Sequence, residues 1–111
     1  MSSKAYKLRS KVWIFVGGAK KETKSGQSLG KWHFITIPKE TAAEIKATFG
    51  KRARGWGSLP VTTTIGETTW DSSIFPDSKS GTYILPLKFT VRKAEKLTNG
   101  DEVAFKLTIR L

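Results

Sequence analysis

Apolar and polar residues alternate along most of this chain, and two short stretches replace the alternation with a helical period. In residues 4–16 Tyr6, Leu8, Val12, Ile14 and Val16 share one parity, whereas Lys7, Arg9 and Lys11 occupy the other. Because successive strand side chains point to opposite faces of a sheet, this pattern predicts a strand with one buried face and one basic, solvated face. At its end Trp13 and Phe15 make the second face apolar as well, so we expect that end to be covered on both sides.

Later segments have the same alternation. The segment "KWHFITI" ends at a proline, and residues 59–75 divide at Gly66-Glu67, which is typical of a tight hairpin turn. A short segment, "TYILP", follows a cluster of turn residues, and "EVAFKLTIRL" alternates with every second residue apolar. Together with residues 4–16, these segments predict about six strands.

Two segments have the period of a helix instead. The first, "PKETAAEIKATFG", predicts a helix of about three turns that Gly50 caps at its C-terminal end. The second, "LKFTVRKAEKLTNGD", predicts a shorter helix that stops at Asn99-Gly100. The residues expected on the apolar sides of these helices are Ala42, Ile45 and Phe49 in the first and Val91, Ala94 and Leu97 in the second.

The order of these elements predicts a mainly β fold, a small barrel with two short helices, because no alternating βαβ spacing indicates a wide parallel sheet. "FITIPKETAAEIKATFG" followed by "VTTTI" has the same pattern as "YILPLKFTVRKAEKLTNGD" followed by "VAFKLTI". This similarity predicts a pseudo-duplicated barrel. The length of 111 residues fits one domain over 1–111, in which the Gly, Lys and Ser-rich residues 17–30 form a long flexible basic loop.

Charge is distributed unevenly along the chain. The formal net charge is +11, and residues 1–54 hold 13 Lys or Arg against three acidic residues, whereas the remaining residues are almost neutral. Such asymmetry favours one basic face that attracts a polyanion, although excess lysine can also serve solubility alone.

Several functional classes find little support in the composition. The absence of cysteine removes thiolate metal sites and cysteine nucleophiles, and it fits a cytoplasmic protein. With a single histidine, His33, neither a metal site nor a general base is indicated, and Ser72 and Ser73 lack the framework of a nucleophile. No membrane-spanning segment is present. We therefore expect a monomeric, non-enzymatic protein without cofactor or metal.

The candidate contacts to nucleic acid are basic residues of the first half together with one tryptophan. Trp13, Trp32 and Trp70 lie in predicted strands, so we expect them to pack in the core or on the sheet. Trp56 lies between glycines beside Arg54, where its ring either stacks on a base or closes one end of the barrel. The full candidate set is Lys7, Arg9, Lys11, Lys20, Lys21, Lys24, Lys51, Arg52, Arg54 and Trp56.

Two long segments hold a recurring set of motifs, "WHFITIPKETAAEIKATFGKR" and "VTTTIGETTWDSSIFPDSKSGTYILPLKFTVRKAEKLTNGDEV". The motif positions fall in order: Ser73, Phe75 and Pro76, then Leu85 and Pro86, then Val91 to Ala94, then Gly100 and Asp101. With these motifs the chain resembles, over about residues 6–111, the family called domain of unknown function 1905. The insertion at 17–30 departs from the pattern.

The resemblance implies a double-split β-barrel with two short helices, an architecture shared with AbrB-like transcription-factor domains, here fused into one chain. It implies no activity, and DNA binding follows from it only as an analogy between folds. Three hypotheses about function stay open. The first is weakly sequence-specific binding of DNA or RNA, the second is an accessory module for an acidic protein, and the third is a small-ligand or enzymatic pocket at the barrel seam near Ser73, Tyr83 and Arg92.

Overall fold

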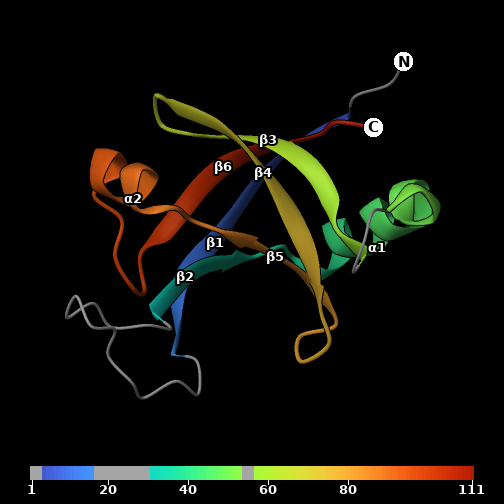
Figure 1. Cartoon of the computed structure of the whole chain (residues 1–111), viewed down its shortest axis with the longest axis horizontal. Coiled ribbons are helices and arrows are strands. Elements are labelled where there is room, and N and C mark those ends of the chain that lie inside the picture. The colour runs from blue at the N-terminus through green and yellow to red at the C-terminus, as the bar shows by residue number, and fades with distance from the viewer. Residues whose placement is uncertain (1–3, 17–30, 54–56) are drawn as a thin grey trace, which may run out of the picture.

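Six antiparallel strands close into a barrel, in the order β1-β2-β5-β4-β3-β6 (Figure 1). The computed structural model describes residues 4–16, 31–53 and 57–111. The elements in chain order are β1 (Lys4–Val16), β2 (Lys31–Thr36), α1 (Lys39–Phe49), the 3₁₀ turn η1 (Gly50–Arg52), β3 (Leu59–Ile65), β4 (Thr68–Asp77), β5 (Thr82–Pro86), α2 (Phe89–Glu95) and β6 (Glu102–Ile109). The predicted mainly β barrel with two short helices is confirmed.

Two long strands close the barrel because each belongs to both of its sheets. In β1, residues 4–11 pair with β6 and residues 12–16 pair with β2. In β4, residues 68–74 pair with β3 and residues 75–77 pair with β5. Every strand therefore has a partner on both sides, and this leaves no strand at the edge of a sheet.

The barrel has an internal two-fold repeat. Strands β2 and β5 pair around Ile35 and Leu85, which face each other, and both side chains are fully buried. The backbone N–H of Ile37 donates to the carbonyl of Tyr83 at 2.8 Å, and the N–H of Leu87 donates to the carbonyl of His33 at 2.9 Å. The same bond is thus made twice, and α1 and α2 lie at opposite ends of the barrel (Figure 1). The order of strand, helix and strand thus occurs twice, in β2, α1 and β3 and again in β5, α2 and β6, as the sequence pattern predicts.

The core is formed largely by alternate residues of the strands, whose side chains point into the barrel. Every second residue of β3 and β6 is buried, and the core residues of β6 are Val103, Phe105, Leu107 and Ile109. Helix α1 adds the predicted Ala42, Ile45 and Phe49, whereas α2 adds only Val91. Within the described residues neither helix is long and apolar enough to cross a bilayer.

Helix α1 ends as predicted, whereas α2 ends earlier than predicted. Gly50 is the C-cap of α1, and its backbone N–H donates to the Lys46 carbonyl; its φ of −56° is right-handed, so the chain continues into η1. Helix α2 ends at Glu95 because Lys96 is left-handed, with φ 55°. Ala94, expected on the apolar side of this helix, is exposed, and Asn99-Gly100 forms the turn before β6 and does not end the helix.

We expect the Leu85→Ala variant to lose about 2–5 kcal/mol of the free energy of unfolding, because this fully buried side chain lies at the centre of the β2–β5 pairing. The matched variant Leu97→Ala removes a side chain that is only partly buried, and it should cost about 1 kcal/mol. Urea denaturation followed by tryptophan fluorescence measures both. Equal losses would show that the β2–β5 seam is not a centre of stability.

Candidate nucleic-acid interface

The exterior face of β1 presents a row of three cations, Lys7, Arg9 and Lys11, all exposed. Their neighbours of opposite parity, Tyr6 and Leu8, pack against the core, so alternation directs the three basic side chains outward. Alternate residues of a strand are about 6.5 Å apart, which spaces these cations evenly over about 13 Å. The sequence prediction of a strand with one wet, basic face is confirmed.

Strand β6 extends this basic surface. Its exposed Lys106 lies directly opposite Lys7, and Ala104 lies opposite Arg9. Two like charges facing each other across neighbouring strands repel, so the Lys7–Lys106 pair costs stability until an anion is near. We call Lys7, Arg9, Lys11 and Lys106 the basic row.

One acidic side chain, Glu102, lies directly opposite Lys11 in the register, where the two opposite charges attract. Within the described residues, however, no ion pair joins Glu102 to any member of the row. Directly after β6, the Arg110 Nε lies 3.9 Å from Oδ1 of Asp71, so the charge of Arg110 is partly compensated. The cations of the row, without such an ion pair among the described residues, remain available to an external anion.

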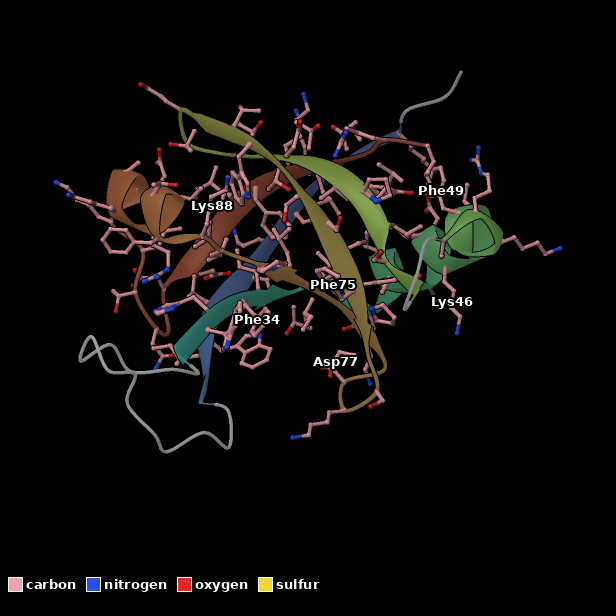
Figure 2. The ribbon with its side chains drawn as sticks, in the orientation of Figure 1. Phe34, Lys46, Phe49, Phe75, Asp77 and Lys88 are labelled. Atoms are coloured by element: carbon pink, nitrogen blue, oxygen red, sulfur yellow. The ribbon has the colours of Figure 1, made fainter. Side chains whose placement is uncertain are left out.

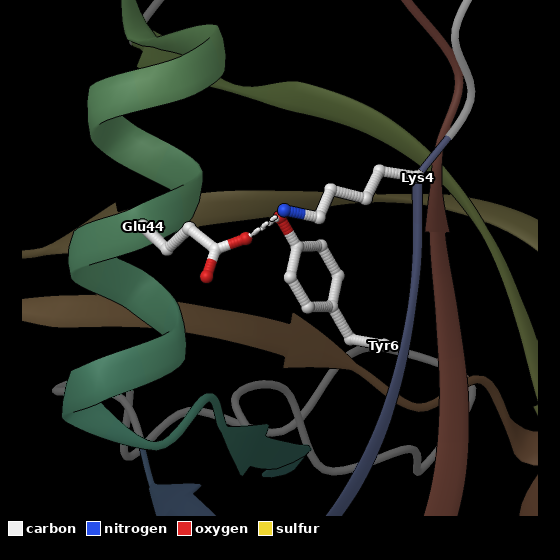
Figure 3. A network of polar contacts seen from close by, with 3 residues as sticks. All are labelled: Lys4, Tyr6 and Glu44. Atoms are coloured by element: carbon white, nitrogen blue, oxygen red, sulfur yellow. Dashed lines mark hydrogen bonds and ion pairs between the residues drawn. The ribbon is translucent and has the colours of Figure 1, made fainter.

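Lys4, on the opposite face of β1, is occupied within the protein (Figure 3). Its ammonium pairs with the Glu44 carboxylate of α1, and the Tyr6 hydroxyl donates to the same oxygen at 3.1 Å. Burial is the main cause that raises the pKa of Tyr6 to about 12, and the Glu44 carboxylate adds to it. Hydrogen bonds from Lys4 and Tyr6 lower the pKa of Glu44. This network holds α1 against the start of β1.

The other predicted basic residues are not brought into the row by any described contact. Lys51 and Arg52 are exposed on η1, where the Arg52 guanidinium lies 5.5 Å from the centre of the Phe49 ring. The candidates Lys20, Lys21, Lys24, Arg54 and Trp56 lie outside the described residues. Lys106 was missed from the sequence, although the alternation of the last strand already assigned it to the polar face.

The predicted seam residues do not form one group. Ser73 lies on the same side of β4 as the exposed Phe75, whereas Tyr83 is buried on the other side of the sheet. Burial raises the pKa of Tyr83. Arg92 lies on α2, where its Nη1 is 3.5 Å from Nε2 of the half-buried His33. The described residues contain no cluster of three side chains that could ligate a metal.

The tryptophans differ from one another in exposure. Trp70 is buried and Trp13 is half-buried, but Trp32 is 56% exposed, so of its two expected positions it occupies the sheet exterior and not the core. Trp32 lies two residues before Phe34 on the exterior of β2, whereas Ile35 of the other parity occupies the core. Trp13 packs on Phe34 at the barrel surface, and both side chains are half-buried. The second face of this end of β1 was expected to be covered, but it belongs to the apolar exterior of the barrel.

These features define the class of protein: a closed six-stranded antiparallel barrel with an internal repeat and a basic exterior row. The family model described as "Domain of unknown function (DUF1905)" matches residues 19–107. The chain belongs to this family. A comparison with curated proteins finds no match.

The high pKa of Tyr6 predicts a loss of stability at alkaline pH. The fold raises this pKa from 10.0 to about 12, so the neutral phenol stabilises the folded state fully below pH 10, and the contribution is lost as pH rises through about 12. The Tyr6→Phe variant should remove the tyrosinate absorbance step near pH 12 and leave the Tyr83 ionisation. If the Tyr6→Phe variant instead loses an absorbance step near pH 10, the pKa of Tyr6 is not raised, and this would contradict the network of Lys4, Tyr6 and Glu44.

Proposed function

We propose that this protein is a non-enzymatic module that binds nucleic acid through the basic row, with weak sequence specificity. The single observation that carries the proposal is the set of four exposed cations on adjoining strands, Lys7, Arg9, Lys11 and Lys106, none of which forms an ion pair among the described residues. Phosphate groups are regularly spaced anions, and each one neutralised by Lys or Arg releases counterions. The cysteine-free composition favours a cytoplasmic setting.

Weak specificity follows from where the cations stand. They lie on a sheet exterior with Thr64 and Ala104 beside them, and side chains of this kind contact phosphates more readily than base edges. Helix α1 is poorly suited to the major groove, because it exposes Glu40 and Glu44 and because Glu44 is held by Lys4 and Tyr6. Affinity should therefore depend on salt much more than on base sequence.

The triple variant Lys7→Gln, Arg9→Gln, Lys11→Gln should lower the slope of log affinity against log salt by about 2 to 3, since each lost phosphate contact removes about 0.7–0.9. Fluorescence anisotropy with a labelled oligonucleotide, beginning near 50 mM salt, measures the slope. The matched control is Lys88→Gln, Lys93→Gln, Lys96→Gln, which removes three exposed charges around α2. Equal effects of the two variants would show that net charge alone attracts the ligand.

A second candidate function, binding of a small anion, is favoured by a pocket of about 550 Å³ between α1 and the β4–β5 turn. Lys39 and Lys46 line it from α1, and within the described residues neither has an ion pair. Lys46 and Asp77, on either side of this region, are labelled in Figure 2. The Asp77 carboxylate also lines the pocket and accepts a hydrogen bond from the Ser80 hydroxyl at 2.8 Å. With two ammonium groups against this one carboxylate, the charge of the lining is positive and favours a carboxylate or phosphate ligand.

Inorganic phosphate or succinate should raise the melting temperature in a concentration-dependent way if either binds in this pocket, because a ligand that binds only the folded state stabilises it. The double variant Lys39→Gln, Lys46→Gln should abolish the rise at constant ionic strength. The control Lys7→Gln, Lys11→Gln should keep it. A rise that is equal in both variants would place the anion elsewhere.

A further inference from the structure

An exposed apolar hollow lies on the exterior of the sheet formed by β2, β5 and β4. Phe34 of β2 pairs with Pro86 of β5, and two residues further along β5, Ile84 pairs with Phe75 of β4, so these neighbouring exterior pairs together cover all three strands. These four residues and Trp32 line a shallow hollow of about 480 Å³. Phe34 and Phe75 are labelled in Figure 2. We call these five residues the aromatic surface.

The exposure of this surface is unusual. Trp32 is 56% exposed and Phe75 is 38% exposed, although large aromatic side chains are mostly buried in folded proteins. Exposed apolar residues that occur singly need no explanation, but here they are contiguous across three strands. Such a contiguous surface indicates a site that another molecule covers.

The aromatic surface continues the basic row without a break. On the exterior of β1, Lys11 is followed two residues later by Trp13, whose ring centre lies 5.1 Å from that of Phe34. The Trp13 indole N–H donates to the Thr36 hydroxyl at 2.8 Å, which fixes the orientation of the ring. From Lys7 to Trp13 this face of β1 spans about 20 Å, with cations first and aromatic rings next.

We propose that the aromatic surface stacks unpaired bases while the basic row contacts the phosphates, so that the ligand is single-stranded DNA or RNA. This inference rests on the proposed nucleic-acid function and specifies its substrate. In a duplex the faces of the bases are stacked on one another, whereas a single strand presents them to aromatic side chains. Cations that track a backbone beside rings that stack bases are the combination found in single-strand-binding proteins.

A second copy of the chain fits this surface less well. A stable dimer buries roughly 800 Å² on each partner, and an aromatic surface of five side chains is small by comparison. Self-association here would also bring two basic rows close together, and their like charges would repel. The adjoining positive charge instead favours a polyanion with apolar faces.

The test compares a labelled single-stranded oligothymidylate with a duplex of equal length by fluorescence anisotropy. Trp32→Ala and Phe75→Ala should each weaken single-strand binding about 5- to 100-fold, with the salt slope and duplex binding unchanged, because base stacking releases no counterions. Both side chains are exposed, so their removal should leave the fold intact. The matched control is Phe89→Ala, which removes a ring that is 63% exposed on α2, outside the aromatic surface.

The outcomes separate the two proposals. Absence of binding to both the single strand and the duplex near 50 mM salt would overturn the nucleic-acid function itself. Retention of wild-type affinity by Trp32→Ala and Phe75→Ala, while the triple basic variant loses binding, would overturn base stacking alone. Equal affinity for single strand and duplex would also overturn stacking. Polyglutamate serves as a probe for an acidic protein. If Trp32→Ala weakens binding of polyglutamate as much as it weakens binding of the oligonucleotide, the ligand of the aromatic surface is an acidic protein and not a single-stranded nucleic acid.

Discussion

Closure of the barrel by β1 and β4 is the constraint on which the rest of the structure depends. Each strand pairs along one part with one sheet and along the other part with the second sheet. Because both sides of every strand are paired, successive side chains point alternately to the core and to the exterior of the barrel. The exterior residues of β1 are therefore held in a straight series that crosses from one sheet to the other.

That crossing explains why charge and aromatic surface meet. Where β1 pairs with β6, its exterior side chains are cations, and where it pairs with β2, the exterior ring of Trp13 packs on Phe34. The repulsion between Lys7 and Lys106 lies in the same region. The surface thus combines uncompensated charge with exposed rings, and neither is needed to close the barrel.

Local patterns predicted much of the fold and three of the four cations of the basic row. The period of two identified the strands and directed Lys7, Arg9 and Lys11 outward. Lys106 was missed because its position opposite Lys7 depends on the register between two strands far apart in sequence. The exposure of Trp32 was missed because β2 is apolar on both parities, so alternation could not say which side faced the core.

The end of α2 and the small-anion pocket could not be predicted from the sequence either, for different reasons. Lys96 takes the left-handed conformation that usually belongs to glycine, and Asn99-Gly100 gave a stronger but later stop signal. The pocket brings Lys39 and Lys46 of α1 beside the β4–β5 turn, and this depends on how α1 docks on the barrel. Helix docking is a tertiary property that no window of sequence reports.

The continuity of the basic row with the aromatic surface is tested most directly by titrating the isotope-labelled protein with a single-stranded oligonucleotide and following the backbone amide shifts. The largest changes should run along β1 from Lys7 to Trp13 and continue to Trp32, while amides around Lys46 stay unchanged. Changes centred on α1 and the β4–β5 turn, with β1 unaffected, would contradict a single binding surface on the exterior of the barrel.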